Sequence, residues 1–546
     1  MKLANWAGWS LCLAMASSIL IGCTSSRDQA DTGGQISPAK PQELHMMLSL
    51  EPDTLDASKS AAAVSFDIMN ATQEGLYRLD NSGKPQPAIA KDMPEISSDG
   101  LTYTIRLKED VQWADGTPVT AQDFEYAWKR TLNPETKSDY AFMVAWIKGG
   151  ESYSQGKGGT AEEVAVQALD RKTLRFTLER PLAYMTSQLA FPIFFPQKRD
   201  FVEKQEGKYG ADADKLLANG PFRVESWDHE QGLKLVRNEA YWDAESVKLE
   251  KVELQIVKDG NTAENLYQSG TLDVVRINSV QAASWKDKPD YQSVEALWVW
   301  YLEMNEQRRE FQNEKIRQAL ALGIDRNAYV NTVFSNGTKS ANGFVPYYTF
   351  DGNGGMFRKV SGDVLPAFDA AKAKKLLAEG LKELGLSALP KLKLTGDDID
   401  ESKKGLEFLQ GQLRQNLGIE VEIETLPPKL RYDRGQKKDY DMMMFGWGAD
   451  YNDPMTFLDV HESKSPFNQS GFQSAEYDKL IAAARVEPDH AKRARMLVDA
   501  EKILAEKLPV APIYYRTYSY LVKPNIKDVY LSKVGIDWEI KWASVK

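Results

Sequence analysis

An apolar stretch near the start of the chain most limits what the rest can fold into. It runs from Leu3 to Ile21, and no later apolar run approaches the ~20 residues needed to span a bilayer. The chain is 42% hydrophobic and 27% charged, which excludes a disordered, collagenous or multi-span membrane protein. We therefore expect a globular body behind an N-terminal targeting segment.

Residues 1–22 have the features of a lipoprotein export signal. Lys2 is the one charged residue among them, and Leu20-Ile21-Gly22 leads directly into Cys23. A basic start, an apolar middle and a small residue before the cleavage site define an export signal. The ending resembles the lipoprotein version, in which the cysteine receives two acyl chains, palmitate among them, that hold the protein at a membrane. We predict a lipidated, flexible tether over residues 23–40 and a body outside the cytoplasm, anchored to the cell membrane by Cys23. A transmembrane anchor is the alternative, which scattered polar residues in the run disfavour.

Composition and motifs disfavour a metal site, a cofactor and a nucleic-acid partner. Cys12 and Cys23 are the only cysteines, and no pair of the four histidines has a metal-ligand spacing, so we expect no metal and no cofactor. The net charge of −10 is spread over interleaved acids and bases, which disfavours a nucleic-acid partner. No nucleophile elbow, P-loop or dinucleotide fingerprint occurs, so the sequence carries no signature of these enzyme classes. Carboxylate pairs such as Asp450 and Asp453 leave a glycosidase open.

Short strands and helices alternate from residue 44 onward without an internal repeat, which predicts a mixed α/β protein of about three or four globular units. Thr120 and Asp123 predict a capping box that opens a helix ending at residues 133–134. Apolar spacing predicts further helices at about 313–323, 406–417 and 491–507. Residues 419–424 alternate strictly, which predicts a strand with one wet face.

The stretch from Phe445 to Leu458 carries the densest functional signal. Gly446 and Gly448 flank Trp447, and glycines let another backbone approach closely and leave N–H and C=O groups free to pair. Asp450 follows, at a place suited to accept an ammonium group. A tight turn with a structural tryptophan explains this pattern equally well when the stretch is considered alone.

Collinear motifs along residues 44–546 resemble the oligopeptide- and dipeptide-binding lipoproteins of peptide ABC importers, the family 5 extracellular solute-binding proteins. The matching segments follow in order: Glu51–Asp56, Gln73–Leu79, Gly100–Thr104, Asp115–Phe124, Asn219–Phe222, Tyr241–Asp243, Gly270–Asp273 and Phe445–Leu458. So many points of agreement in one order make chance negligible.

The resemblance implies an α/β fold of the two-lobed periplasmic-binding-protein type (class II, cluster C), with an extra inserted domain and mixed β-sheets flanked by helices. Mapped onto this chain, it implies three domains. Domain I would comprise residues 41–73, 200–297 and 517–546, the inserted domain II residues 74–199, and domain III, the opposing lobe, residues 298–516.

The resemblance also implies a non-catalytic receptor, not an enzyme, that captures oligopeptides between its lobes and delivers them to the membrane permease subunits of an ABC importer, as a monomer. Ligand main chain would pair with protein main chain, as in strand addition. The residues implied are Gly446 and Gly448 as backbone partners, Asp450 for the peptide α-amino group, Ala63 and Val64 as opposing backbone, Tyr140 at a ligand terminus, and Trp447, with Trp298 and Trp300, as pocket walls.

One position departs from the family pattern. Some relatives carry an arginine for the ligand carboxylate two residues before the first glycine, where this chain has Met444. The carboxylate anchor and the ligand length therefore stay open. The same fold could instead bind a nickel complex, haem or an oligosaccharide, and a secreted hydrolase is the alternative from a different class.

Overall fold

The computed structural model describes residues 41–80 and 83–546, and Pro41–Lys546 form one compact unit. The predicted export signal, the tether and Cys23 lie outside the described residues. Within the described part of the chain, no helix is both long and apolar enough to cross a membrane.

One large mixed sheet forms the backbone of this unit. Its strands pair in parallel within β1–β10, β1–β11, β14–β15 and β14–β16 and antiparallel elsewhere. In spatial order they are β15 (Val421–Leu426), β14 (Leu392–Asp397), β16 (Met442–Gly448), β12 (Tyr291–Met304), β17 (Val510–Val522), β11 (Val274–Ile277), β1 (Glu43–Leu48), β10 (Lys251–Ile256), β9 (Gly232–Arg237) and β8 (Phe222–Asp228), with β13 (Lys339–Ser340) on β17.

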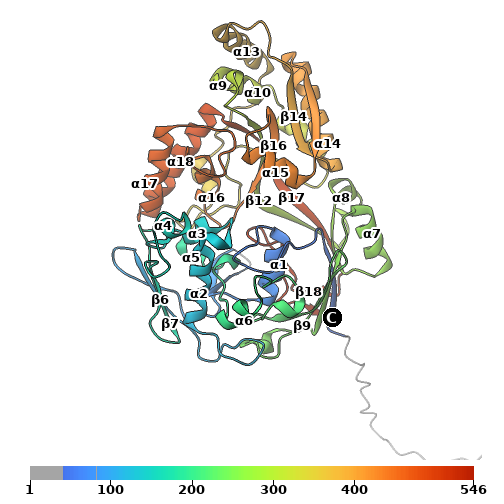
Figure 1. The fold of residues 1–546 in the computed structure, drawn as a ribbon. Coiled ribbons are helices and arrows are strands. Elements are labelled where there is room, and N and C mark those ends of the chain that lie inside the picture. The colour runs from blue at the N-terminus through green and yellow to red at the C-terminus, as the bar shows by residue number, and fades with distance from the viewer. Residues whose placement is uncertain (1–40, 81–82) are drawn as a thin grey trace, which may run out of the picture. The chain divides into compact units, whose positions relative to one another are not determined.

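The two long central strands, β12 and β17, join the two halves of this sheet (Figure 1). Their antiparallel pairing shifts register twice, between Glu295 and Val299 and between Trp300 and Tyr301. Such irregularities bend a strand and increase its twist. The predicted boundaries at 297/298 and 516/517 fall at the first shift, where Glu295 pairs with Thr517 and Val299 with Tyr515. The domain boundaries themselves stay predictions.

A separate four-stranded sheet packs against α2 (Ala121–Leu132). Its order is β4 (Glu95–Ile96), β5 (Thr102–Arg106), β7 (Thr173–Thr177) and β6 (Val166–Ala168). The capping box of Thr120 and Asp123 is present at the start of α2, and the helix buries Phe124 and Trp128 as their spacing predicts. The predicted end of this helix is also confirmed, because Asn133 caps it.

The predicted helices of the later chain are confirmed, with one shifted boundary. They are α10 (Glu314–Leu322), α14 (Asp400–Leu417) and α18 (His490–Lys507). Helix α14 begins six residues before the predicted start, because its first turn is polar and carries no apolar periodicity. Gly418 ends it in the left-handed conformation, with φ +70°, as a C-terminal glycine does.

The predicted strand at 419–424 is β15, which begins at Val421 and forms an edge of the large sheet. Helices α10, α13 (Ala370–Leu384), α14, α17 (Ala475–Val486) and α18 lie with β14–β16 in the upper group of Figure 1. Helices α1 (Ala63–Thr72), α2 and α6 (Arg199–Lys204) lie in the lower group. Mixed sheets flanked by helices are the α/β architecture that we predicted.

Candidate functional site

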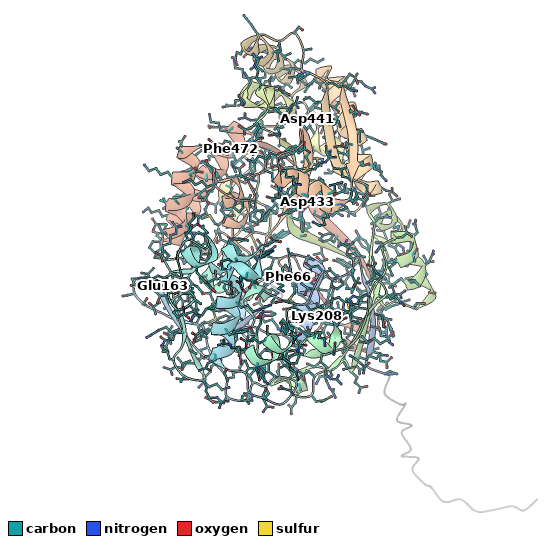
Figure 2. All side chains as sticks on the ribbon, in the orientation of Figure 1. Phe66, Glu163, Lys208, Asp433, Asp441 and Phe472 are labelled. Atoms are coloured by element: carbon teal, nitrogen blue, oxygen red, sulfur yellow. The ribbon has the colours of Figure 1, made fainter. Side chains whose placement is uncertain are left out.

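A cavity of about 310 Å³ lies where the upper and lower groups of elements meet. Its walls come from α1, the loop at Tyr140, the end of β16, α15 (Pro428–Gln436) and the loop 532–537. Figure 2 labels Phe66 on α1 in the lower group and Asp433 on α15 in the upper group, and the cavity lies between these two helices. It gathers seven of the nine residues predicted at the ligand site, namely Ala63, Tyr140, Trp298, Gly446, Trp447, Gly448 and Asp450.

Gly446 and Gly448 lie where a side chain would meet the tryptophans of the neighbouring strand. Each lies opposite a tryptophan of β12, with Gly448 facing Trp298 and Gly446 facing Trp300. A Cβ at Gly448 would lie 2.5 Å from Trp298 Cε3, and one at Gly446 would lie 2.6 Å from Trp298 Nε1. The two glycines therefore make room for indole rings of the neighbouring strand.

Among the described residues, the opposite edge of β16 has no strand partner next to these glycines. Strand β14 pairs with β16 only at Met442 and Met443. The N–H of Ala449 donates to the carbonyl of Leu297 on β12 at 2.8 Å. Successive residues of a strand direct their backbone groups to opposite sides, so Gly448 and Gly446 direct N–H and C=O away from β12, toward the open edge.

Asp450 lies just beyond this edge and its carboxylate has no cation beside it among the described residues. Its side chain accepts a hydrogen bond from Tyr140, whose hydroxyl donates to Asp450 Oδ1 at 3.3 Å. Burial disfavours the ionised carboxylate and raises the pKa of Asp450 to about 7, although the Tyr140 hydrogen bond acts in the other direction. An entering ammonium group would supply the missing countercharge.

Tyr140 is held in an aromatic cluster on the other side of the cavity. Its ring packs against Phe66 and Phe191, each with its centroid 5.5 Å away. Burial and the nearby Asp450 carboxylate raise the pKa of the Tyr140 hydroxyl, which stays protonated and available as a donor. We expected Tyr140 at a ligand terminus, and the structure brings it to Asp450, 310 positions away in the sequence.

Ala63 and Val64 occupy the first turn of α1. Ala63 is exposed and lines the cavity, whereas Val64 is buried and lines a neighbouring cavity of about 30 Å³ instead. The first N–H groups of a helix have no intrahelical acceptor, and the residue before this helix, Ala62, provides no side-chain cap. This segment can therefore donate backbone hydrogen bonds, while its carbonyls serve the helix.

The three tryptophans predicted as possible walls have different surroundings. Trp447 lines the cavity and packs on Phe467, with ring centroids 4.8 Å apart. Trp298 also lines it, and the indole N–H groups of Trp298 and Trp447 are buried without an acceptor among the described residues. Trp300 packs on Tyr514 and does not line the cavity.

Several cavity residues carry no signal in the sequence. Arg431 and Tyr432 come from α15, and Lys533 and Asp537 come from the loop 532–537. This loop reaches the site through backbone hydrogen bonds, in which Leu297 N–H donates to Lys533 O and Gly535 N–H donates to Ala449 O. Polar residues in an irregular segment near the end of the chain have no periodicity that would predict such a position.

Asp453, the other acid of the motif, is part of the protein interior. Both of its carboxylate oxygens accept from Arg493, at 2.7 and 2.8 Å, and it also caps the N–H of Met455. Over residues 41–80 and 83–546, no group of three or more His, Cys, Asp or Glu side chains is arranged to hold a metal ion.

Comparison with known proteins identifies the family of this chain. The sequence profile of the bacterial extracellular solute-binding proteins, family 5, matches residues 84–469. The chain belongs to this family. It is 33% identical over 539 residues to the dipeptide-binding protein DppE of Bacillus subtilis, covering 98% of each chain. The resemblance found in the motifs is thereby confirmed.

Solved structures agree in fold. The oligopeptide-binding protein OppA of Listeria monocytogenes, bound to peptide, is 37% identical and superposes with a TM-score of 0.82, covering 93% of this chain and 100% of that one. The substrate-binding domain of an oligopeptide ABC transporter from Bacillus anthracis is 34% identical, with a TM-score of 0.83 and coverage of 93% and 99%. The two-lobed α/β fold class of the periplasmic binding proteins is confirmed.

Proposed function

We propose that this protein is an extracytoplasmic receptor that captures oligopeptides in the cavity beside β16 and hands them to the permease subunits of an ABC importer. The observation that carries the proposal is the Asp450 carboxylate, which has no cation partner in the described part of the chain and lies at the end of an open strand edge. A peptide offers both of the matching groups, since it has an α-ammonium at its start and regularly spaced N–H and C=O groups after it.

Main-chain recognition suits a receptor for many sequences. Backbone groups of Gly446 and Gly448 face the open edge, and a ligand strand added there would pair with them whatever its side chains are. On the opposite wall, the first turn of α1 at Ala63 offers N–H donors to ligand carbonyls. Val64 is buried in this turn, so its part is limited to the backbone.

Capture and release, without turnover, is the activity that we propose. The family is one of solute-binding proteins, and the relatives compared above are named for binding or transporting peptides. For the other ligands of this fold, the carboxylate at Asp450 favours an amine-bearing solute over a neutral sugar. We further propose that lipid on Cys23 holds the receptor at the cell membrane, close to its permease, and that it acts as a monomer.

Native mass spectrometry of protein purified under non-denaturing conditions tests the proposal. We expect mass additions that correspond to co-purified peptides of mixed sequence, which also give the preferred length. Recovery of a single non-peptide solute, or conversion of an added peptide into products, would show that this protein has a different function.

A further inference from the structure

Arg431 is a charged side chain on the wall of the cavity that leaves hydrogen-bond donors unused. It lies on α15, its side chain is 10% exposed, and its Nε donates to Asp397 Oδ1 at 2.5 Å. Its Nη1 is buried and has no acceptor among the described residues. A guanidinium has five N–H donors in a planar fork, so one carboxylate oxygen leaves most of this fork unused.

The charged groups near Arg431 determine how much of its guanidinium is paired. Asp397 is its one ion-pair partner in the described part of the chain. Glu303 also feels the charge of Arg431, but burial raises the pKa of Glu303 to about 8, so this carboxyl group is mainly protonated at neutral pH. The guanidinium lies over the ring of Phe445, with Cζ 4.8 Å from its centroid, which fixes its place along β16.

The position of the Phe445 ring indicates how far Arg431 lies from Asp450, the residue proposed to bind the peptide amine. Phe445 lies on β16, and Asp450 follows the end of this strand, five positions after Phe445. At 3.3–3.4 Å per residue, five extended residues span at most ~17 Å, which is also the length of an extended peptide of about five residues. A peptide with its ammonium at Asp450 that runs along Gly448 and Gly446 therefore brings its fourth or fifth residue to Arg431.

We propose that Arg431 is a binding residue for a carboxylate of the ligand, on the wall of the cavity about five peptide residues from Asp450. The carboxylate comes from the C-terminus of a peptide of about five residues or from an acidic side chain near that point. The inference rests on the proposed peptide-binding function and assigns a cation to it. Met444, at the position where some relatives carry an arginine, is buried against Leu302 and carries no charge.

Titration calorimetry with matched peptides tests this assignment. The probes are a pentapeptide with a free C-terminus, the same peptide as a C-terminal amide, and an amide pair with Glu or Gln at residue four. We expect the wild-type protein to bind the free acid, or the Glu peptide, about 10- to 100-fold more tightly than its neutral partner, as a hydrogen-bonded charge pair provides. Which pair shows the preference identifies the source of the carboxylate.

Three variants separate recognition from folding. Arg431→Gln should bind the acidic peptide and its neutral partner with about equal affinity. The double variant Asp397→Asn/Arg431→Gln leaves no stranded charge and should give the same ratio while folding more stably. Arg434→Gln is the matched control, since Arg434 lies on the same helix, pairs with Glu424 at 2.7 Å and does not line the cavity. It should keep the wild-type ratio.

The outcomes are distinct. Equal binding of acid and neutral partner by the wild type in both pairs, or an acid preference that survives in both Arg431 variants, overturns the assignment while leaving the peptide-receptor function intact. A loss of stability without a change in ratio shows that Arg431 only holds Asp397 in place, which also overturns it. Failure of every peptide to bind the wild type removes the proposed function and this assignment together.

Discussion

At the residue scale, Asp450 is a carboxylate whose burial is tolerated only at a cost. Tyr140 donates to it weakly at 3.3 Å, and no described cation neutralises it. Removing one member of a buried, hydrogen-bonded ion pair costs about 2–5 kcal/mol, because a charge is left unpaired. The contribution of Asp450 to ligand binding can therefore be measured.

We expect Asp450→Ala to lower the affinity for free peptides by roughly 30-fold to several-thousand-fold, at about 1.4 kcal/mol per factor of ten. N-acetylation of the peptide should weaken wild-type binding to a similar degree. The two changes should be strongly non-additive, since each removes the same contact. Titration calorimetry of the four combinations measures this, and additive losses would show that Asp450 does not bind the amine.

The pKa of Asp450 predicts how binding depends on pH. Because burial raises this pKa from 3.8 to about 7, the carboxyl group of the folded, ligand-free protein is mainly protonated below pH 7. Binding an ammonium then requires release of this proton. Peptide affinity should therefore fall by up to tenfold per pH unit as the pH drops below about 7. Calorimetry in buffers of different ionisation enthalpy should detect proton release.

The raised pKa of Asp450 also makes the stability of the fold depend on pH, but in the opposite direction to peptide affinity. Between pH 3.8 and about 7 the folded state holds a proton that the unfolded state has released, so the contribution of Asp450 to the free energy of unfolding decreases as the pH rises through this window.

Asp459 is the control for the pH dependence of affinity, because burial raises its pKa to about 7 as well. Asp459→Asn should keep the pH dependence of affinity, and Asp450→Asn should abolish it.

At the element scale, the end of β16 combines an open backbone edge with glycines fitted to indole rings. The two features depend on each other, because Trp298 can lie across the strand pair only where Gly448 has no side chain. Extra atoms in a filled site typically cost about 1–3 kcal/mol. Substitution here should therefore disturb both folding and the cavity wall.

We expect Gly448→Ala to lower the free energy of unfolding by about 1–3 kcal/mol and to weaken peptide binding, since its Cβ displaces the Trp298 ring. Adding Trp298→Ala should relieve the clash, so the two losses should not add. Gly411→Ala is the control, because a Cβ there meets nothing within 4 Å. Denaturant unfolding and calorimetry measure these effects, and wild-type values for Gly448→Ala would contradict the packing argument.

At the scale of the whole molecule, β12 and β17 connect the regions above and below the cavity, and their pairing shifts register beside it. A few residues at such a junction can absorb a hinge rotation. The cavity proposed as the ligand site draws its residues from both sides of the junction. Binding and closure should therefore be coupled.

Peptide at saturation should reduce the radius of gyration measured by small-angle scattering on verified ligand-free protein. It should also raise thermal stability, by about 2.7 kcal/mol at a ligand concentration of 100 times Kd. Asp450→Ala at the same peptide concentration should show a smaller change. Identical scattering profiles with and without bound peptide would argue against a hinge at this junction.

Cys23, which lies outside the described residues, is the residue that we propose to anchor the protein at the membrane. We expect Cys23→Ala to leave ligand affinity and folding unchanged, because the substitution lies before the compact unit that begins at Pro41. The protein should move from the membrane fraction to the soluble extracytoplasmic fraction, provided that the lipid is its anchor. Wild-type membrane retention of the variant would contradict lipid anchoring at this residue.

Local chemistry in the sequence determined much of the secondary structure and pointed to one wall of the site. The capping box at Thr120 and the C-terminal glycine of α14 act within a few residues, so their patterns are readable directly. The polar first turn of α14 was missed because it carries no apolar period. The glycine and aspartate motif near Trp447 pointed to the end of β16 only together with the family resemblance, because its residue types alone fitted a structural turn equally well.

Only the tertiary structure decided how these parts meet. The hydrogen bond from Tyr140 to Asp450 joins residues 310 positions apart, and the unused donors of Arg431 depend on which carboxyl groups lie beside it. The raised pKa of Asp450 likewise comes from burial. Burial, partner choice and the fit of an indole ring over a glycine are properties of distant segments packed together, and a sequence pattern read a few residues at a time does not contain them.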